Sequence, residues 1–411
     1  MPRWTFASRR APGRPAPGSG APAGRIGGAA ARPAWLLRIV LLALVVRLLS
    51  AGLAFYANVV FPPFQREQFT ISGTTDKFWD TFARWDSGWY YGIASKGYRF
   101  VEGGRSNLAF FPAFPIAMRY AGLALGGRME DYYRGGVAVS WMAFLGAMVG
   151  LALLARLDLD EAGAERAVLH CAVFPFAFFF GLVYSESTFL CGLVWAIYGL
   201  RTQRWWLAAA MGALVVCARV NGIVSVPAMA WIAWVSAGRD RTQRVNALLA
   251  VLAMVAAFVL WCAYVYWLSG SFIEWKASIE RWGYYPGGYP WTPVWRFLTA
   301  MATQPAGHLM SGGLAPYDAF NAVMALLFVV AAPFVWRRLG AGYALLVLTN
   351  LALPLSSGQF EGLGRYCSVL FPVFIWMGTW TTGRPQQYAL VLSGALYTLA
   401  LSLFTTIHPL W

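Results

Sequence analysis

The chain has 411 residues, of which 59% are hydrophobic and only 12% are charged, and its formal net charge is +15. Soluble domains carry about 25% charged residues, so this composition excludes an ordinary soluble protein and predicts an all-α polytopic membrane protein. The positive charge does not indicate a nucleic-acid partner, because the arginines form short clusters between apolar segments and no contiguous basic face. The five cysteines and three histidines match no metal-ligand spacing, so we expect neither a bound metal nor a disulfide framework.

The N-terminal segment is rich in Pro, Ala, Gly and Arg and contains six arginines but no acidic residue. This composition predicts a disordered basic cytoplasmic tail over residues 1–33. The pair Arg9-Arg10 is also compatible with a twin-arginine export signal. The apolar run that follows, about 34–57, is too long for a cleaved signal sequence, so we interpret it as an uncleaved first membrane span.

Apolar runs then recur to the end of the chain, so residues 34–411 are expected to form one transmembrane domain. Several runs are too short to cross a bilayer alone and predict half-helices or helices packed inside the bundle. We expect about eleven spans, at 34–57, 136–155, 166–184, 187–200, 206–218, 220–236, 245–268, 319–336, 341–355, 366–382 and 387–406.

Lys and Arg in the short loops set the orientation. With the N-terminus in the cytoplasm, the basic clusters at 201–204, 239–244 and 337–338 all fall on the cytoplasmic side, as the positive-inside rule requires. This orientation requires that the apolar segment 108–126 does not span. That segment contains two prolines and the central Arg119, which indicate an interfacial or re-entrant helix.

Two large external loops follow from this orientation, at about 58–135 and 269–318. Both are rich in aromatic residues, which are typical of a membrane-interface belt and which also form stacking platforms for sugar rings. The Gly-, Ala-, Arg- and Pro-rich composition favours a GC-rich bacterial genome, so we expect a bacterial plasma membrane.

The first external loop contains the most informative segment, residues 82–98. Asp86 can begin a helix there, and Gly97 suits a left-handed C-cap. On that helix Trp85, Trp89 and Ile93 would share one apolar face, with Asp86 on a neighbouring face. We therefore expect an amphipathic helix on the outer membrane surface that presents a carboxylate at the boundary between water and lipid.

Two interpretations of Asp86 remain open from the residues alone. The first is an N-cap, in which the carboxylate only accepts hydrogen bonds from the first turn. The second is a general base, because inverting glycosyl transfer requires a carboxylate that takes the proton from the acceptor hydroxyl. One carboxylate suffices when the leaving group is a phosphate, which needs little acid assistance.

Several motifs together resemble the PIG-V family, which comprises the GPI mannosyltransferase 2 enzymes and their bacterial relatives in the GT-C superfamily. The resemblance extends over most of residues 34–380. It is carried by Arg84-Trp85-Asp86 with Tyr90, Gly97 and Tyr98, by Phe110-Phe111-Pro112-Ala113-Phe114-Pro115, by Phe174 to Ser187 with its Tyr184-Ser185-Glu186-Ser187 end, by Arg219-Val220-Asn221-Gly222, and by Gly364-Arg365-Tyr366 before Phe371-Pro372. Val220 departs from the family pattern, which has Ser at that position.

The resemblance implies a GT-C bundle with a long first external loop that carries surface helices. It also implies a polyprenyl-phosphate mannose donor and inverting transfer that requires no metal or other cofactor. The acidic residue of the first external loop, here Asp86, is then the base. The partners would be membrane lipid, the donor and a glycolipid, glycan or protein acceptor at the outer face; the sequence leaves the oligomeric state open.

We predict that the substrate-binding residues are Arg84, Trp89, Tyr90, Tyr184, Glu186, Arg219, Asn221 and Arg365. Arginine at membrane depth needs a partner, and its planar fork matches a phosphate. For Arg219 the alternative partner is Glu186, and for Arg365 the alternative role is an interface anchor.

Three of these residues also have structural interpretations. Glu186 could be a solvated acid in a turn, and Asn221 could simply turn the chain. Arg84, like Lys96, also fits an anchor that snorkels to lipid headgroups.

Two competing functions remain. A transporter or lipid flippase would show internal repeats and ionisable residues at the bilayer midplane. A non-catalytic membrane scaffold would place no special requirement on Asp86.

Overall fold

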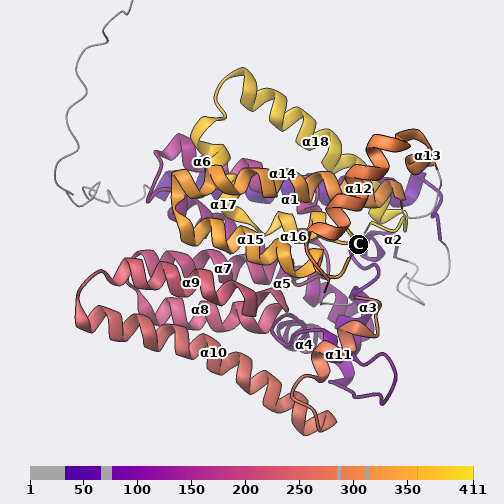
Figure 1. Ribbon diagram of the computed structural model, residues 1–411. Helices are drawn as coiled ribbons and strands as arrows, with labels where there is room; N and C mark the ends of the chain where they lie inside the picture. Colours follow the sequence, from indigo (N-terminus) through magenta and orange to yellow (C-terminus); the bar gives the residue numbers. More distant parts are fainter. Residues whose placement is uncertain (1–32, 66–75, 285–287, 311–314, 359, 411) are drawn as a thin grey trace, which may run out of the picture.

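The computed structural model describes residues 33–65, 76–284, 288–310, 315–358 and 360–410, so all but the last residue of the predicted tail lies outside the described residues. The described residues are helical and contain no strand (Figure 1). The α-helices are α1 Pro33–Val60, α2 Lys77–Asp80, α3 Ser87–Lys96, α4 Ala113–Leu125, α5 Met129–Ala155, α6 Glu161–Ala172, α7 Glu186–Arg201, α8 Trp205–Ala218, α9 Asn221–Ala237, α10 Arg241–Ser269, α11 Glu274–Glu280, α12 Trp291–Thr303, α13 Pro305–Met310, α14 Ala315–Leu339, α15 Ala341–Leu355, α16 Leu363–Ser368, α17 Phe371–Trp380 and α18 Arg384–Thr405; two 3₁₀ helices, η1 Asn107–Ala109 and η2 Ala177–Gly181, complete the set.

Long apolar helices show that the chain is an integral membrane protein. Within the described residues, five helices are long and apolar enough to cross a bilayer: α1, α5, α10, α14 and α18. Much of their surface faces outward, as a lipid-facing helix requires. On α10, for example, Leu260 is 70% exposed and Trp267 is 75% exposed. The expectation of an all-α polytopic membrane protein is confirmed.

Two of the predicted spans are wrong as continuous helices. The run at 166–184 is helical only to Ala172, after which Pro175 has no backbone N–H to continue the helix and the chain forms η2. The run at 366–382 is divided into α16 and α17, with Pro372 in the first turn of α17. Apolar composition alone could not reveal these breaks, because both segments are mostly apolar and mostly buried.

The irregular segment between α6 and α7 obtains its hydrogen bonds from side chains inside the bundle. Arg47 of α1 is only 1% exposed and donates to the carbonyls of Ala177 at 3.0 Å and Ala172 at 3.4 Å. The indole N–H of Trp141 donates to the carbonyl of Gly181 at 3.1 Å. Non-helical backbone at membrane depth is stable only when protein groups satisfy it in this way.

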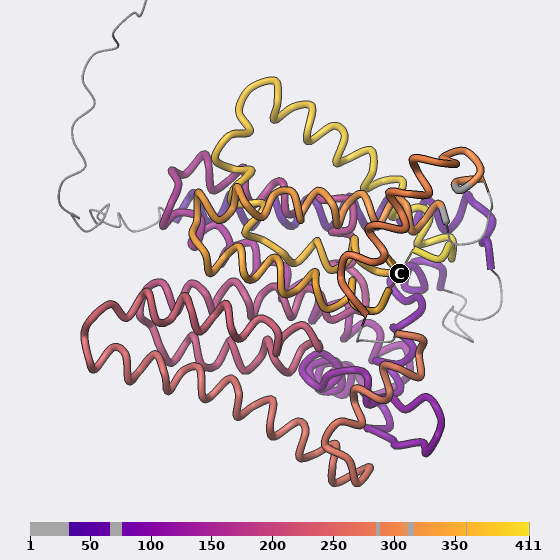
Figure 2. Tube along the Cα trace, viewed as in Figure 1, coloured from indigo at the N-terminus to yellow at the C-terminus, as the bar shows by residue number. Residues whose placement is uncertain are grey.

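The two ends of the bundle differ. The turns between α7 and α8 and between α9 and α10 lie at one end, on the left in Figures 1 and 2, whereas α3, α4 and α11 lie at the other end. At the left end the guanidinium of Arg201 donates to both carboxylate oxygens of Asp158 at 2.9 Å and to the hydroxyl of Tyr343 at 2.9 Å. The predicted basic clusters therefore gather at the end away from α3.

The segment that was predicted to be interfacial forms α4. Its 13 residues span about 20 Å, which is shorter than the ~30 Å hydrocarbon core, so α4 does not cross a bilayer by itself. The helix packs against α3 and α5, and Arg119 donates to the carbonyl of Ala94 at the end of α3 at 2.9 Å. α4 therefore packs against α3 and fixes its position at this end of the bundle.

Candidate active site

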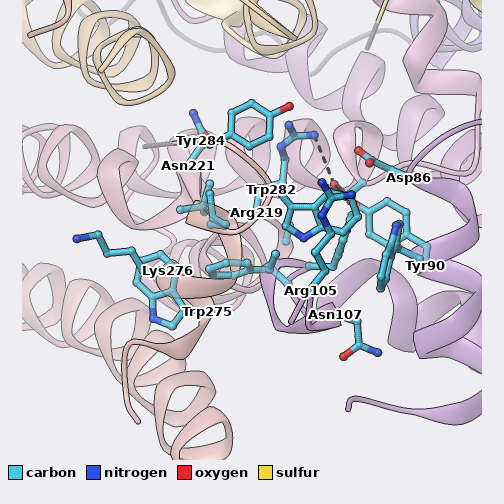
Figure 3. A pocket seen from close by; sticks show the side chains of 18 of the residues that line it. Asp86, Tyr90, Arg105, Asn107, Arg219, Asn221, Trp275, Lys276, Trp282 and Tyr284 are labelled. Atoms are coloured by element: carbon cyan, nitrogen blue, oxygen red, sulfur yellow. Dashed lines mark hydrogen bonds between the residues drawn. The ribbon is translucent and has the colours of Figure 1, made fainter. Parts of the chain in front are cut away.

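A cavity of about 1100 Å³ lies at the α3 end of the bundle (Figure 3). Its walls come from α3, the loop after α3, the α8–α9 turn, α11 with the residues after it, and the segment around 353–366. Polar and aromatic side chains from these separate elements converge in the cavity, whereas Ile223, Val224 and Leu353 form an apolar wall. A large concave site with a few converging polar groups is the usual form of a ligand pocket.

Two carboxylates and two arginines form a continuous chain of ion pairs at the inner end of this pocket. Arg365 Nη1 lies 2.9 Å from Asp86 Oδ2, and Arg365 Nε lies 3.2 Å from Glu186 Oε1. Arg219 pairs with the same Glu186 oxygen. Glu186 is fully buried, whereas the Asp86 side chain is 30% exposed. This series of ion pairs thus leads from the protein interior to a carboxylate that faces the pocket.

Asp86 stands at the N-terminus of α3, but its side chain caps nothing: no cap hydrogen bond is formed, and the backbone has helical φ and ψ of −59° and −21°. The N-cap interpretation is therefore wrong, and the carboxylate is used instead for Arg365. Gly97 does take a positive φ of 86°, but its ψ of −175° is not the predicted left-handed cap.

The turn before Asp86 is held in an unusual conformation. Trp85 has a φ of 51°, which L-residues rarely adopt and which is found preferentially at functional sites. The Tyr184 hydroxyl lies beneath this turn, where it donates to the Arg84 carbonyl at 3.0 Å and accepts from the Asp86 N–H at 3.3 Å. Tyr184 is fully buried and does not line the pocket, so in this structure it positions the Asp86 turn, and substrate binding by Tyr184 stays a prediction.

The buried face of α3 differs from the predicted one. Tyr90, Ile93 and Ala94 are buried, and Trp89 points into the pocket, where its ring meets that of Trp282 edge-on at 4.8 Å. Tyr90 lines the pocket too and its hydroxyl lies 2.9 Å from the Ser185 hydroxyl. Burial raises the pKa of Tyr90, so the phenol stays protonated and can donate.

Arg84 is neither a snorkelling anchor nor part of the pocket wall. Its side chain is 1% exposed, pairs with Asp80 at 2.9 Å, and donates to the carbonyl of Thr405 at 3.1 Å and to Asn58 Oδ1 at 3.2 Å. These partners belong to α1, α2 and α18, so Arg84 joins the ends of three helices. The anchor role is therefore wrong, because the guanidinium is buried and bound by protein groups, whereas substrate binding by Arg84 stays a prediction.

The α8–α9 turn brings Arg219 and Asn221 to the pocket. The turn is tight because Gly222 packs directly on the backbone of Val215 and Val216, where any Cβ would clash. Arg219 lines the pocket and is paired with Glu186, as its alternative interpretation predicted. Asn221 Nδ2 donates to the Asn350 carbonyl at 3.1 Å, whereas its buried Oδ1 has no hydrogen-bond partner among the described residues.

Sequence reasoning missed several pocket residues. Glu361 lines the pocket and accepts a hydrogen bond of 2.9 Å from the Tyr284 hydroxyl. Trp282 carries the guanidinium of Arg105 over its ring at 4.8 Å. The only sequence signals were the aromatic richness of residues 269–318 and the position of Glu361, four residues before Arg365.

The pocket rim is basic. Lys96, Arg99, Arg105 and Lys276 line it, and all four are exposed. Among the residues that the structure describes, no group of three or more His, Cys, Asp or Glu residues could hold a metal ion. The charged groups that line the pocket are thus carboxylates, arginines and lysines, and amide, hydroxyl and aromatic side chains accompany them.

The fold and this pocket define a polytopic membrane protein with a carboxylate–arginine site at one end of its helical bundle. Comparison with known protein families identifies the family to which the chain belongs. The chain belongs to the mannosyltransferase (PIG-V) family, whose model matches residues 32–277.

Two mammalian relatives show the same relationship. The chain is 28% identical to GPI alpha-1,6-mannosyltransferase 2 of Rattus norvegicus over 203 residues and 26% identical to the Cricetulus griseus protein of that name over 178 residues. These matches cover 44% and 42% of this chain, and 39% and 35% of the relatives. The chain thus matches well under half of the length of either relative.

The structure also resembles archaeal oligosaccharyltransferases from Archaeoglobus fulgidus. For the apo form the TM-score is 0.44 at 12% identity, and for AglB in complex with an inhibitory peptide and a dolichol-phosphate it is 0.45 at 14% identity. Each comparison covers 89% of this chain and 56% of the archaeal chain.

Proposed function

We propose that the protein is an inverting glycosyltransferase that moves mannose from a polyprenyl-phosphate donor to a hydroxyl of a glycolipid, glycan or protein acceptor. The observation that carries the proposal is the Asp86 carboxylate, which faces a large aromatic-lined pocket, caps no helix and is held by Arg365. Family membership supports hexosyl transfer as the reaction.

The donor fits the two kinds of pocket wall. A polyprenyl tail can lie along the apolar residues Ile223, Val224 and Leu353 of the pocket wall. Its phosphate then meets Arg219 and Arg365, and the basic rim adds further positive charge. Trp89 and Trp282 offer ring faces and edges to the apolar C–H face of the sugar.

In the proposed reaction Asp86 takes the proton from the acceptor hydroxyl as the oxygen attacks the anomeric carbon. The new bond joins the acceptor oxygen to that carbon, and the bond to the phosphate oxygen breaks on the opposite face. The polyprenyl phosphate leaves with the electron pair, which the arginines stabilise, and the anomeric configuration is inverted. Arg365 holds Asp86 in place, and we propose that no metal takes part.

We place the reaction at the outer face of a bacterial plasma membrane, with the N-terminus in the cytoplasm. The positive-inside rule supports this orientation, because the basic clusters lie at the end of the bundle away from the pocket.

Asp86→Asn tests the proposal. Asn preserves the shape of the side chain and can still accept a hydrogen bond from Arg365, but it cannot take a proton. We expect the variant to fold and to transfer radiolabelled mannose from a polyprenyl phosphate in membranes ~10²–10⁴-fold more slowly, which is the usual contribution of a general base.

Asp240→Asn is the matched control. Asp240 is a true N-cap, whose side chain accepts from the Gln243 N–H at 2.8 Å at the opposite end of the bundle, and Asn is an equally good cap. This variant is expected to retain full activity. Full activity of Asp86→Asn would remove Asp86 as the base.

A further inference from the structure

Glu361 is the second carboxylate that lines the pocket, and the proposed reaction does not yet use it. It lies between α15 and α16 and accepts a hydrogen bond of 2.9 Å from the Tyr284 hydroxyl. Tyr284 follows α11 and also lines the pocket (Figure 3). Residues from two distant parts of the chain thus fix one oxygen of Glu361.

The charge of Glu361 has no direct cationic partner among the described residues. Arg365 is only four residues away but pairs with Asp86 and Glu186, and Arg219 pairs with Glu186. Burial raises the pKa of Glu361, and the negative charges of Asp318 and Asp86 raise it further, although Tyr284 and Arg365 oppose the shift. A half-buried carboxylate without a cation costs folding free energy, which favours a functional reason for its presence.

The surroundings of Glu361 select the kind of ligand group that can bind there. An unpaired negative charge repels a phosphate. A carboxylate can accept hydrogen bonds at several lone pairs, and hydroxyl groups supply the donors. The rings of Tyr284 and Trp282, which also line the pocket, suit the apolar face of a sugar.

We propose that Glu361 determines sugar specificity by accepting hydrogen bonds from one or more hydroxyl groups of the transferred hexose, with Tyr284 orienting its carboxylate. The proposal rests on the proposed function and deepens it. It orients the donor, with the neutral sugar between Asp86 and Glu361 and the phosphate on the arginine side of the pocket.

The test measures binding of polyprenyl phosphate mannose to the full chain in nanodiscs, together with four analogues that each lack the 2-, 3-, 4- or 6-hydroxyl. The parent protein is compared with Glu361→Gln and with Glu102→Gln, an exposed carboxylate outside the pocket wall. A double-mutant cycle combines the change at Glu361 with the removal of one sugar hydroxyl. It gives the interaction free energy between the carboxylate and that hydroxyl.

We expect the parent and Glu102→Gln to lose on the order of tenfold or more in affinity for at least one analogue, and Glu361→Gln to lose much less for the same analogue. Tyr284→Phe keeps the carboxylate and should reduce the interaction free energy between Glu361 and the hydroxyl without removing it. It therefore provides a second, milder variant if Glu361→Gln folds poorly.

Two results would overturn the proposal. If Glu361→Gln and Tyr284→Phe discriminate among the analogues as well as the parent does, Glu361 touches no sugar hydroxyl, but the proposed function stands. If the parent binds none of these lipid-linked sugars, both the proposed donor and the proposed role of Glu361 are wrong.

Discussion

At the residue scale, the main feature of the site is that one fully buried carboxylate serves two arginines. Glu186 pairs with Arg219 and with Arg365, and Arg365 extends to Asp86. Isolated buried charges are very unfavourable, so each member of this chain is stable only while its partners are present. The position of the Asp86 carboxylate therefore depends on a residue that does not line the pocket.

Glu186→Gln removes the central charge of this series of ion pairs. It leaves Arg219 and Arg365 with one negative charge between them, and we expect the free energy of unfolding to fall by about 3–5 kcal/mol. Thermal unfolding in detergent measures the change.

Glu280→Gln is the control, since its pair with Lys276 is 3.5 Å long and both side chains are well exposed. Surface pairs of this kind contribute about 0–1 kcal/mol. Equal stability of the two variants would show that the buried chain of ion pairs adds nothing to folding.

Single residues also show where sequence reasoning succeeded. Sequence patterns and the family resemblance selected Asp86, Glu186, Arg219 and Arg365 as site residues. The structure places all four in one series of ion pairs. The interpretation of Arg84 as a snorkelling anchor was wrong because a local pattern cannot show that Asp80, Asn58 and Thr405 meet around its guanidinium.

At the scale of the secondary-structure elements, the break between α6 and α7 shapes the site. It allows Tyr184 and Ser185 to reach the α3 turn from a bent, non-helical segment, where a continuous helix would have carried them elsewhere. The sequence predicted most of the long helices within a few residues, because apolar runs bounded by basic turns are a strong signal. The break was missed because Arg47, which satisfies its carbonyls, lies 130 residues away from Ala177.

Arg47→Met tests whether this distant arginine maintains the break. The substitution leaves the Ala177 and Ala172 carbonyls without their donor and removes the guanidinium from the Phe144 ring, which it covers at 4.4 Å. Each buried group left unsatisfied costs about 1–3 kcal/mol, so we expect a loss of roughly 3 kcal/mol or more in stability.

Arg38→Met provides the comparison on the same helix. The Arg38 side chain is 66% exposed and pairs with Glu165 at 3.1 Å, so its removal should change the unfolding temperature very little. An Arg47 variant as stable as the Arg38 variant would show that water or backbone shifts can replace the arginine.

At the scale of the whole molecule, the bundle separates its functions by end. The pocket lies at the end with α3 and α11, and the arginine-rich turns lie at the other end (Figure 1). The sequence predicted this polarity from charge alone, because loop arginines are a topological signal that does not depend on packing. It could not predict the pocket volume or the converging aromatic residues, which depend on how the segments at this end of the bundle pack against one another.

Cysteine accessibility tests the orientation. In a background with all five cysteines replaced by Ala, Glu102→Cys and Arg239→Cys each place one thiol in an exposed position at opposite ends. A membrane-impermeant maleimide added to intact cells should label Glu102→Cys, and it should label Arg239→Cys only after permeabilisation. The reverse pattern would invert the orientation and move the site to the cytoplasmic face.

The pocket has one hydrocarbon-like wall, at Ile223, Val224 and Leu353, and one charged rim, at Lys96, Arg99 and Arg105. For a ligand with a long isoprenoid tail, occupancy of such a pocket depends on the mole fraction of the ligand within the leaflet, and its concentration per litre has little meaning. Added detergent or carrier lipid would then lower the rate by surface dilution, without any change in the protein. Kinetic comparisons between variants therefore require a fixed lipid-to-protein ratio.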